Sequence, residues 1–158
     1  DFGVDDFKKG WASHFLCDKL WNQAIDNNFP EIFEDEKSQG WGSERWVKNT
    51  ALKNILDLEA IKMFDIKKYL PLLIYTFCPN GEPVEQMQEY YKRIQELYGV
   101  NREMTIDDLK QMWLWLGIGE ELAEKVTEKS EEFAGSPELV NKICEQYGEM
   151  LNLSEQGS

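Results

Sequence analysis

Apolar residues recur at steps of three and four along most of this chain, which places them on one face of an α-helix. The clearest example is the segment 84–98, whose apolar stripe includes Met87 and Ile94. No stretch alternates apolar and polar residues in the way that a half-buried strand does. We therefore expect an all-α protein, built as a single-domain bundle of about six to eight short helices.

Capping and stop residues mark the expected helix ends. Ser43 and Ser136 are N-cap residues, and Thr105 with Asp108 forms a variant of the capping box. Gly99 is placed to end a helix in the left-handed conformation. The expected helices cover residues 5–27, 43–56, 57–64, 65–77 with a kink at Pro71, 84–98, 105–117, 120–134 and 137–153.

The length of 158 residues suits one domain, which we expect to span residues 1–153. Residues 154–158 are expected to be a disordered tail. The acidic, turn-rich segment 30–42 is the expected long loop, and neighbouring apolar side chains are expected to hold it against the core. These side chains are Phe29, Ile32 and Phe33.

The charge balance restricts the classes of partner. Thirty Asp and Glu residues outnumber 17 Lys and Arg, which gives a net charge of −13 that repels phosphate backbones and anionic bilayers. No apolar run approaches the roughly 18 residues of a membrane span. We expect no nucleic-acid partner, no membrane insertion and a monomer. Aromatic residues make up 13% of the chain, which is too apolar for a disordered acidic protein.

Catalytic motifs are absent from the sequence. His14 is the only histidine, so every His-based triad or metal site depends on it, and its place on the apolar side of its helix favours a structural role. Paired acids such as Glu120 and Glu121 stand mostly in first turns, where they compensate the helix dipole. We expect no enzymatic activity, no metal and no cofactor.

The aromatic residues give the binding hypotheses. Trp113 and Trp115 point in directions about 200° apart, so their helix is apolar all round and is either central to the bundle or faces a ligand on one side. The ligand-site candidates are Tyr90, Tyr91, Trp113 and Trp115. Trp41 and Trp46, which flank a helix start, are candidates for binding a partner protein.

Cysteines and a sequon bear on the compartment. Cys17 and Cys144 belong to the first and last helices, and a disulfide between them would close nearly the whole chain, but Cys78 can pair with either by arithmetic. Asn152 begins an Asn-Leu-Ser sequon. The chain starts without Met, so we expect that a leader was removed or that the sequence was trimmed. Together these features favour secretion.

The acidic chain beginning near Asp1, with tryptophans spread along its length, resembles the tryptophan-rich small secreted salivary proteins of blood-feeding mosquitoes. The resemblance covers size, charge and composition over the whole chain. It implies a secreted, helical, non-enzymatic protein that scavenges a small host mediator or binds a host immune or haemostatic protein. The tryptophans are Trp11, Trp21, Trp41, Trp46, Trp113 and Trp115.

Two function classes therefore compete. The first is a secreted helical binding protein for a small apolar or amphipathic ligand, or for a host protein. The second is an intracellular acidic interaction module excised from a larger protein, with reduced thiols and an exposed apolar patch where its neighbour packed.

Overall fold

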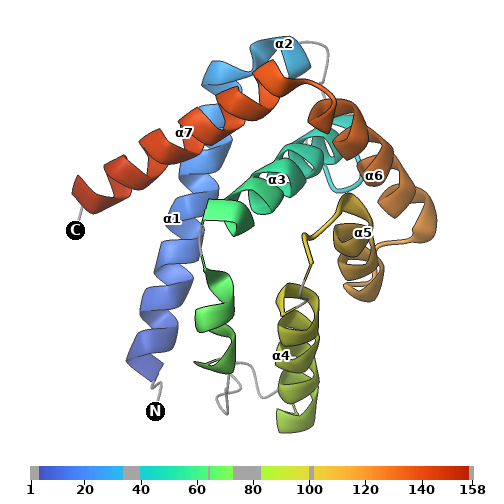
Figure 1. Ribbon diagram of the computed structural model, residues 1–158. Coiled ribbons are helices and arrows are strands. Elements are labelled where there is room, and N and C mark those ends of the chain that lie inside the picture. Colours follow the sequence, from blue (N-terminus) through green and yellow to red (C-terminus); the bar gives the residue numbers. More distant parts are fainter. Residues whose placement is uncertain (1–3, 34–39, 64, 73–82, 100–101, 157–158) are drawn as a thin grey trace.

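The computed structural model describes residues 4–33, 40–63, 65–72, 83–99 and 102–156 (Figure 1). Within these ranges the chain forms seven α-helices and two short 3-10 helices, and no strand. The prediction of an all-α bundle is therefore confirmed.

Helix α3 (Glu44–Met63) lies at the centre of the arrangement. It packs most closely against α6 (Glu120–Ala134), and further contacts come from α7 (Pro137–Gln156) and α5 (Ile106–Trp115). Helix α7 also crosses α1 (Val4–Asn28) near the short helix α2 (Pro30–Phe33). Helix α4 (Val84–Tyr98) contacts the 3-10 helix η2 (Leu70–Leu72), which follows η1 (Ile66–Lys68).

The core lies where α1, α2, α3, α6 and α7 meet. Phe29 and Phe33 are buried there, so the expected contact between the start of the loop and the core is confirmed, although residues 30–33 form a helix and 34–39 lie outside the described residues. The buried residues of this core are Trp21, Ile25, Phe29, Phe33, Ala51, Leu52, Ile55, Phe133 and Ile143.

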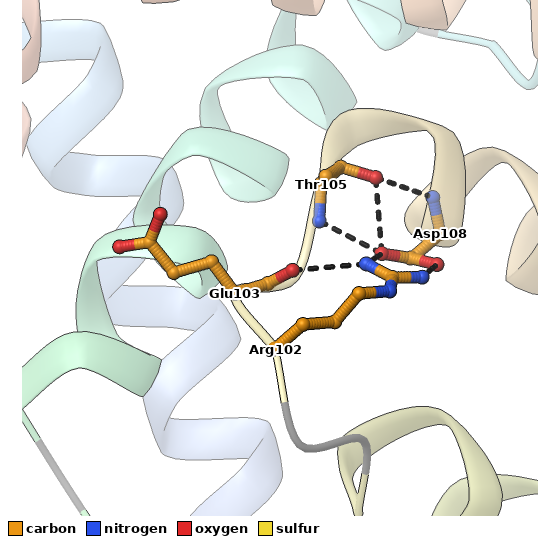
Figure 2. Close-up of polar contacts among 4 residues, drawn as sticks. All are labelled: Arg102, Glu103, Thr105 and Asp108. Atoms are coloured by element: carbon orange, nitrogen blue, oxygen red, sulfur yellow. Dashed lines mark hydrogen bonds and ion pairs between the residues drawn. The ribbon is translucent and has the colours of Figure 1, made fainter.

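The N-cap predictions are confirmed in the structure. The Ser43 hydroxyl accepts a hydrogen bond from the backbone N–H of Trp46 at 3.2 Å. Thr105 and Asp108 form the reciprocal capping box, and Arg102 donates to both carboxylate oxygens of Asp108 at 2.7 and 2.6 Å (Figure 2). These side chains satisfy backbone N–H groups that have no partner within the helix.

The prediction for Gly99 is wrong in its backbone conformation. Gly99 follows α4 with a φ of −83°, and glycine is required because a Cβ would collide with the carbonyl oxygen of Gln95. Gly117, at the end of α5, has a φ of +88°, in the left-handed region that favours glycine. The close approach of a carbonyl and a positive φ are thus separate reasons for glycine at a helix end.

Three element boundaries differ from the predictions. Helix α3 is continuous to Met63, so Asp57 lies inside it and does not begin a new helix. The helix expected from Asp65 is replaced by η1 and η2, with Pro71 inside η2, and 73–82 lies outside the described residues. Helix α7 runs to Gln156, so residues 154–156 continue a helix where a disordered tail was expected.

Residues 14–17 of α1 are exposed, contrary to the apolar pattern of this helix. Phe15 is 68% exposed, whereas Trp21, two turns further along, is 4% exposed. His14 is also exposed and forms an ion pair with Asp18 at 3.3 Å, so the prediction that it lies on a buried face is wrong. The reason is that α7 covers only the part of α1 nearer α2 (Figure 1).

Candidate functional site

The structure divides the four predicted ligand-site residues between two clusters. Trp113 joins Trp46 at a ring-centroid distance of 6.3 Å, and Trp46 lies 4.6 Å from Trp41. Trp41 is 72% exposed, so this tryptophan row runs from the protein surface toward the interior. The row links the candidate partner-binding residues to one of the candidate ligand-binding residues.

The second cluster lies between α4 and α5. The ring centroid of Tyr90 lies 5.3 Å from that of Trp115 and 5.4 Å from that of Tyr91. The Arg93 guanidinium lies over the Trp115 ring, 5.1 Å from its centroid. The adjoining cavity is small, about 140 Å³, and Arg93 already occupies one ring face. It is lined by Arg93, Ile94, Leu97, Gln111, Met112 and Trp115.

Trp113 has a structural partner in the core. Its indole N–H donates to the side-chain oxygen of Asn54 at 3.1 Å, and the Asn54 amide donates to the Ser130 hydroxyl at 3.1 Å. Asn54 and Ser130 are buried, so each needs these hydrogen bonds to offset its desolvation. This chain of bonds joins α5, α3 and α6, which accounts for Trp113 without a ligand.

The candidate disulfide between Cys17 and Cys144, one of the pairings that the sequence left open, is absent, and both thiols are free. Cys144 lies near Glu59 and Lys62 of α3, and partial burial together with Glu59 raises the pKa of its thiol. Cys17 is exposed and instead lies near Tyr147. The sulfurs thus face different neighbours. Cys78 and the side chain of Asn152 lie outside what the structure describes.

A cavity larger than the one beside Trp115, which sequence analysis did not identify, lies between α3, η1, α4 and α7. Its volume is about 330 Å³, within the size range of small-molecule sites. Asp57, Ala60 and Ile61 form its α3 wall, because residues three and four apart lie on one face of a helix. The complete lining is Asp57, Ala60, Ile61, Ile66, Tyr69, Tyr98 and Tyr147.

Asp57 is the single carboxylate of this lining. No group in the described residues gives it a hydrogen bond or an ion pair, and the cation that acts on its pKa is Lys53, one turn earlier on α3. The Lys53 ammonium is bonded to Asp18 at 3.2 Å instead. Burial therefore raises the pKa of Asp57 to about 6, and Lys53 offsets only part of this effect.

The charge of Asp57 affects the pKa values of two tyrosines in the cavity wall. Burial and, secondarily, Asp57 raise the pKa of Tyr98 to about 12. Burial, Cys17 and then Asp57 raise the pKa of Tyr147. Both phenols remain protonated and neutral at pH 7, so the wall around Asp57 carries no charge except its own carboxylate.

No family model, curated protein or solved structure matches the chain. Any function assigned to the candidate site must therefore be argued from the chemistry of its residues. In the ranges that the structure covers, no group of three or more His, Cys, Asp or Glu side chains is arranged to hold a metal ion. Likewise, none of the described helices has the length and apolar character needed to cross a membrane.

The sequence does contain a signal for this cavity. On a helix Asp57 lies beside Ala60 and Ile61, three and four residues later, and an acid next to apolar side chains is a candidate functional residue. Sequence analysis instead assigned Asp57 to a helix start, where an acid is ordinary. The continuity of α3 removes that explanation.

Proposed function

We propose that this chain is a binding protein without catalytic activity, which holds a small amphipathic ligand in the cavity around Asp57. The observation that carries the proposal is an opening of about 330 Å³ whose mainly apolar wall is drawn from several helices and includes one carboxylate and three tyrosines. Small-molecule sites commonly combine apolar walls with a few polar groups in this way.

The other aromatic clusters are weaker candidates for this role. The cavity beside Trp115 has less than half the volume, about 140 Å³, and Arg93 already covers the indole. Trp113 forms a hydrogen bond to Asn54 in the core. The lone His14 is exposed and paired with Asp18, which gives no support for a catalytic role.

The proposal is tested with the neutral fluorescent probe N-phenyl-1-naphthylamine, whose emission rises in apolar cavities. We expect saturable binding to the wild-type protein and a loss of at least tenfold in affinity in Ala60→Phe, because the added ring fills the cavity. Ala134→Phe is the matched control, since it makes the same change beside a different cavity on the opposite side of α3.

Outcomes of this titration separate the candidate sites. Binding that survives in Ala60→Phe and is lost in Trp115→Ala would move the site to the α4–α5 cluster. The absence of saturable binding by the correctly folded wild-type protein would contradict a small-molecule role. Far-ultraviolet circular dichroism of each variant establishes that the helices are intact.

A second candidate function is the docking of a protein partner on Trp41. Its support is the 72% exposure of an indole that Trp46 holds in place by a ring contact. The net charge of −13 favours a basic partner surface. We expect a complex cross-linked in host plasma to be lost in Trp41→Ser and kept in Phe15→Ser, which removes another exposed aromatic ring.

The proposal includes a secreted protein, in accordance with the sequon at Asn152 and the compositional resemblance. Alkylation of natively sourced protein under denaturing, non-reducing conditions, followed by intact mass, tests this part. One added group and a glycan on Asn152 would support an oxidising compartment. Three added groups without a glycan would favour the intracellular interaction module.

A further inference from the structure

The carboxylate of Asp57 forms no ion pair with any of the described residues. It is partly buried in the cavity wall, and Lys53, the cation that acts on its pKa, forms an ion pair with Asp18 at 3.2 Å. A buried charge without a partner is costly, and proteins usually compensate such groups within the fold. Among the described residues, Lys53 compensates the charge of Asp57 only in part, and no residue forms an ion pair or a hydrogen bond with it.

The rest of the lining suits the positive end and the apolar body of an organic cation. Aromatic ring faces attract cations, and three tyrosines surround the cavity. The Lys68 ammonium already stands 5.6 Å from the centre of the exposed Tyr69 ring at the cavity wall. Ala60, Ile61 and Ile66 provide apolar surface beside these rings.

We propose that this cavity binds a small organic ammonium, with its charged group on the Asp57 carboxylate and its apolar body between Ile61, Ile66 and the tyrosine rings. This inference rests on the proposed function and names the class of ligand. It also predicts which classes bind more weakly than a cation. A carboxylate or phosphate ligand would meet Asp57 with like charge, and a fully apolar ligand would leave that charge buried without a partner.

The charge of the whole chain favours the same ligand class. A net charge of −13 raises the concentration of cations near the surface and steers them toward acidic openings. This long-range attraction is unspecific, however, and it acts on any cation at any acidic patch. Evidence for the site must therefore come from changes confined to Asp57.

The test is isothermal titration calorimetry at pH 7.5 with three probes that differ in charge. These are the cation 2-phenylethylamine, the neutral 2-phenylethanol and the anion phenylacetate. We expect the amine to bind wild-type protein at least about tenfold more tightly than the alcohol, because a charge-assisted hydrogen bond contributes a factor of that order. Phenylacetate is expected to bind most weakly.

Two matched variants of α3 locate the effect. Asp57→Asn removes the charge within the cavity, and we expect amine affinity to fall at least about tenfold to the level of the alcohol. Glu59→Gln makes the equivalent change beside another cavity and is expected to leave amine binding unchanged. Retained binding of the alcohol by Asp57→Asn would show that the cavity itself is intact.

Failure of this inference is distinguishable from failure of the proposed function. Equal affinity for amine and alcohol, or amine binding that is unchanged in Asp57→Asn, overturns the inference while leaving a small-molecule site in place. Equal weakening by Asp57→Asn and Glu59→Gln would assign amine binding to surface charge and also overturn it. Absence of binding by all three probes and by the neutral fluorescent probe overturns both.

Discussion

Asp57 is the residue at which folding stability and ligand binding are expected to conflict. Its pKa is raised from 3.8 to about 6 by burial, so the folded protein favours the protonated form. Between these two values the folded state binds more protons than the unfolded state, and stability falls as pH rises. The ionised carboxylate is therefore a destabilising group at neutral pH.

We predict that Asp57→Asn stabilises the protein above pH 6, by at most about 3 kcal/mol. The gain should shrink through the window from pH 6 to 4 and level off below it, as measured by urea unfolding at several pH values. A constant difference between Asp57→Asn and wild type across the window would contradict the buried charge.

Asp108 shows the opposite effect of its surroundings. The Arg102 guanidinium and the Thr105 cap hold the pKa of Asp108 down at about 2, below the ordinary 3.8 (Figure 2). Such a group stabilises the fold above pH 3.8, and the contribution is lost as pH falls toward 2. Asp108 is thus a structural carboxylate, whereas Asp57 lacks any such partner.

We predict that Asp108→Asn lowers the free energy of unfolding by about 1–2 kcal/mol at pH 7, because it weakens the Arg102 bonds and the capping box. Thermal unfolding at pH 7 and pH 2.5 measures this loss, which should be smaller at the lower pH. Asp107→Asn, one residue earlier in the same helix turn, is the control and should change stability by a few tenths of a kcal/mol. Equal losses in the two variants would assign the effect to the helix dipole alone.

At the scale of elements, helix α1 contains two differently packed stretches, residues 14–17 and residues 21–25. Trp21 and Ile25 are buried against α3 and α7, while Phe15 and Leu16 are exposed. The apolar spacing is similar in both stretches, so the sequence pattern alone does not separate them. The difference arises from how much of α1 the neighbouring helices cover.

We predict that Ile25→Ala destabilises the protein by about 3 kcal/mol, since it opens a cavity in the core. Phe15→Ala should change stability by less than about 0.5 kcal/mol, because its ring is already in solvent. Both values come from urea unfolding. A large loss in Phe15→Ala would mean that another surface covers this stretch of α1 in solution.

The helices themselves were predictable because their signals are local. Ser43, Thr105 and Asp108 cap their own backbones within three residues, and those bonds are in the structure. The faces were harder to predict, because burial depends on elements far away in the sequence. The helix of Trp113 and Trp115 was expected to be either central to the bundle or beside a ligand on one side. In the structure Leu109 is its one fully buried residue, and Leu116, which follows the helix, is 48% exposed.

The cavity was not predictable for the same reason. Its walls come from residues 57, 60, 61, 66, 69, 98 and 147, and only the tertiary arrangement of α3, η1, α4 and α7 brings them together. Sequence analysis selected tryptophans as ligand candidates, whereas this cavity contains tyrosines and one acid. The sequence indicated an aromatic helical binder, and the choice among its aromatic clusters required the tertiary structure.

At the scale of the whole molecule, the surplus of 13 negative charges opposes compaction. Exposed ion pairs such as Lys125–Glu121, 2.7 Å apart, offset little of this repulsion. Added salt screens both effects, and the repulsion among many acids outweighs the few weak pairs. Salt should therefore stabilise the fold.

We predict that raising NaCl from about 20 to 500 mM increases the Tm by several degrees, because screening shortens the range of the repulsion. The double variant Glu128→Gln/Glu131→Gln, altered on the exposed face of α6, should start from a higher Tm and gain less from salt. Sucrose, which stabilises without screening, should affect both proteins equally.

The same increase in NaCl should weaken binding of 2-phenylethylamine, since salt screens the attraction between the ligand and the protein. Stability and cation affinity thus respond to salt with opposite signs, and a Tm that falls with salt would show that the ion pairs dominate.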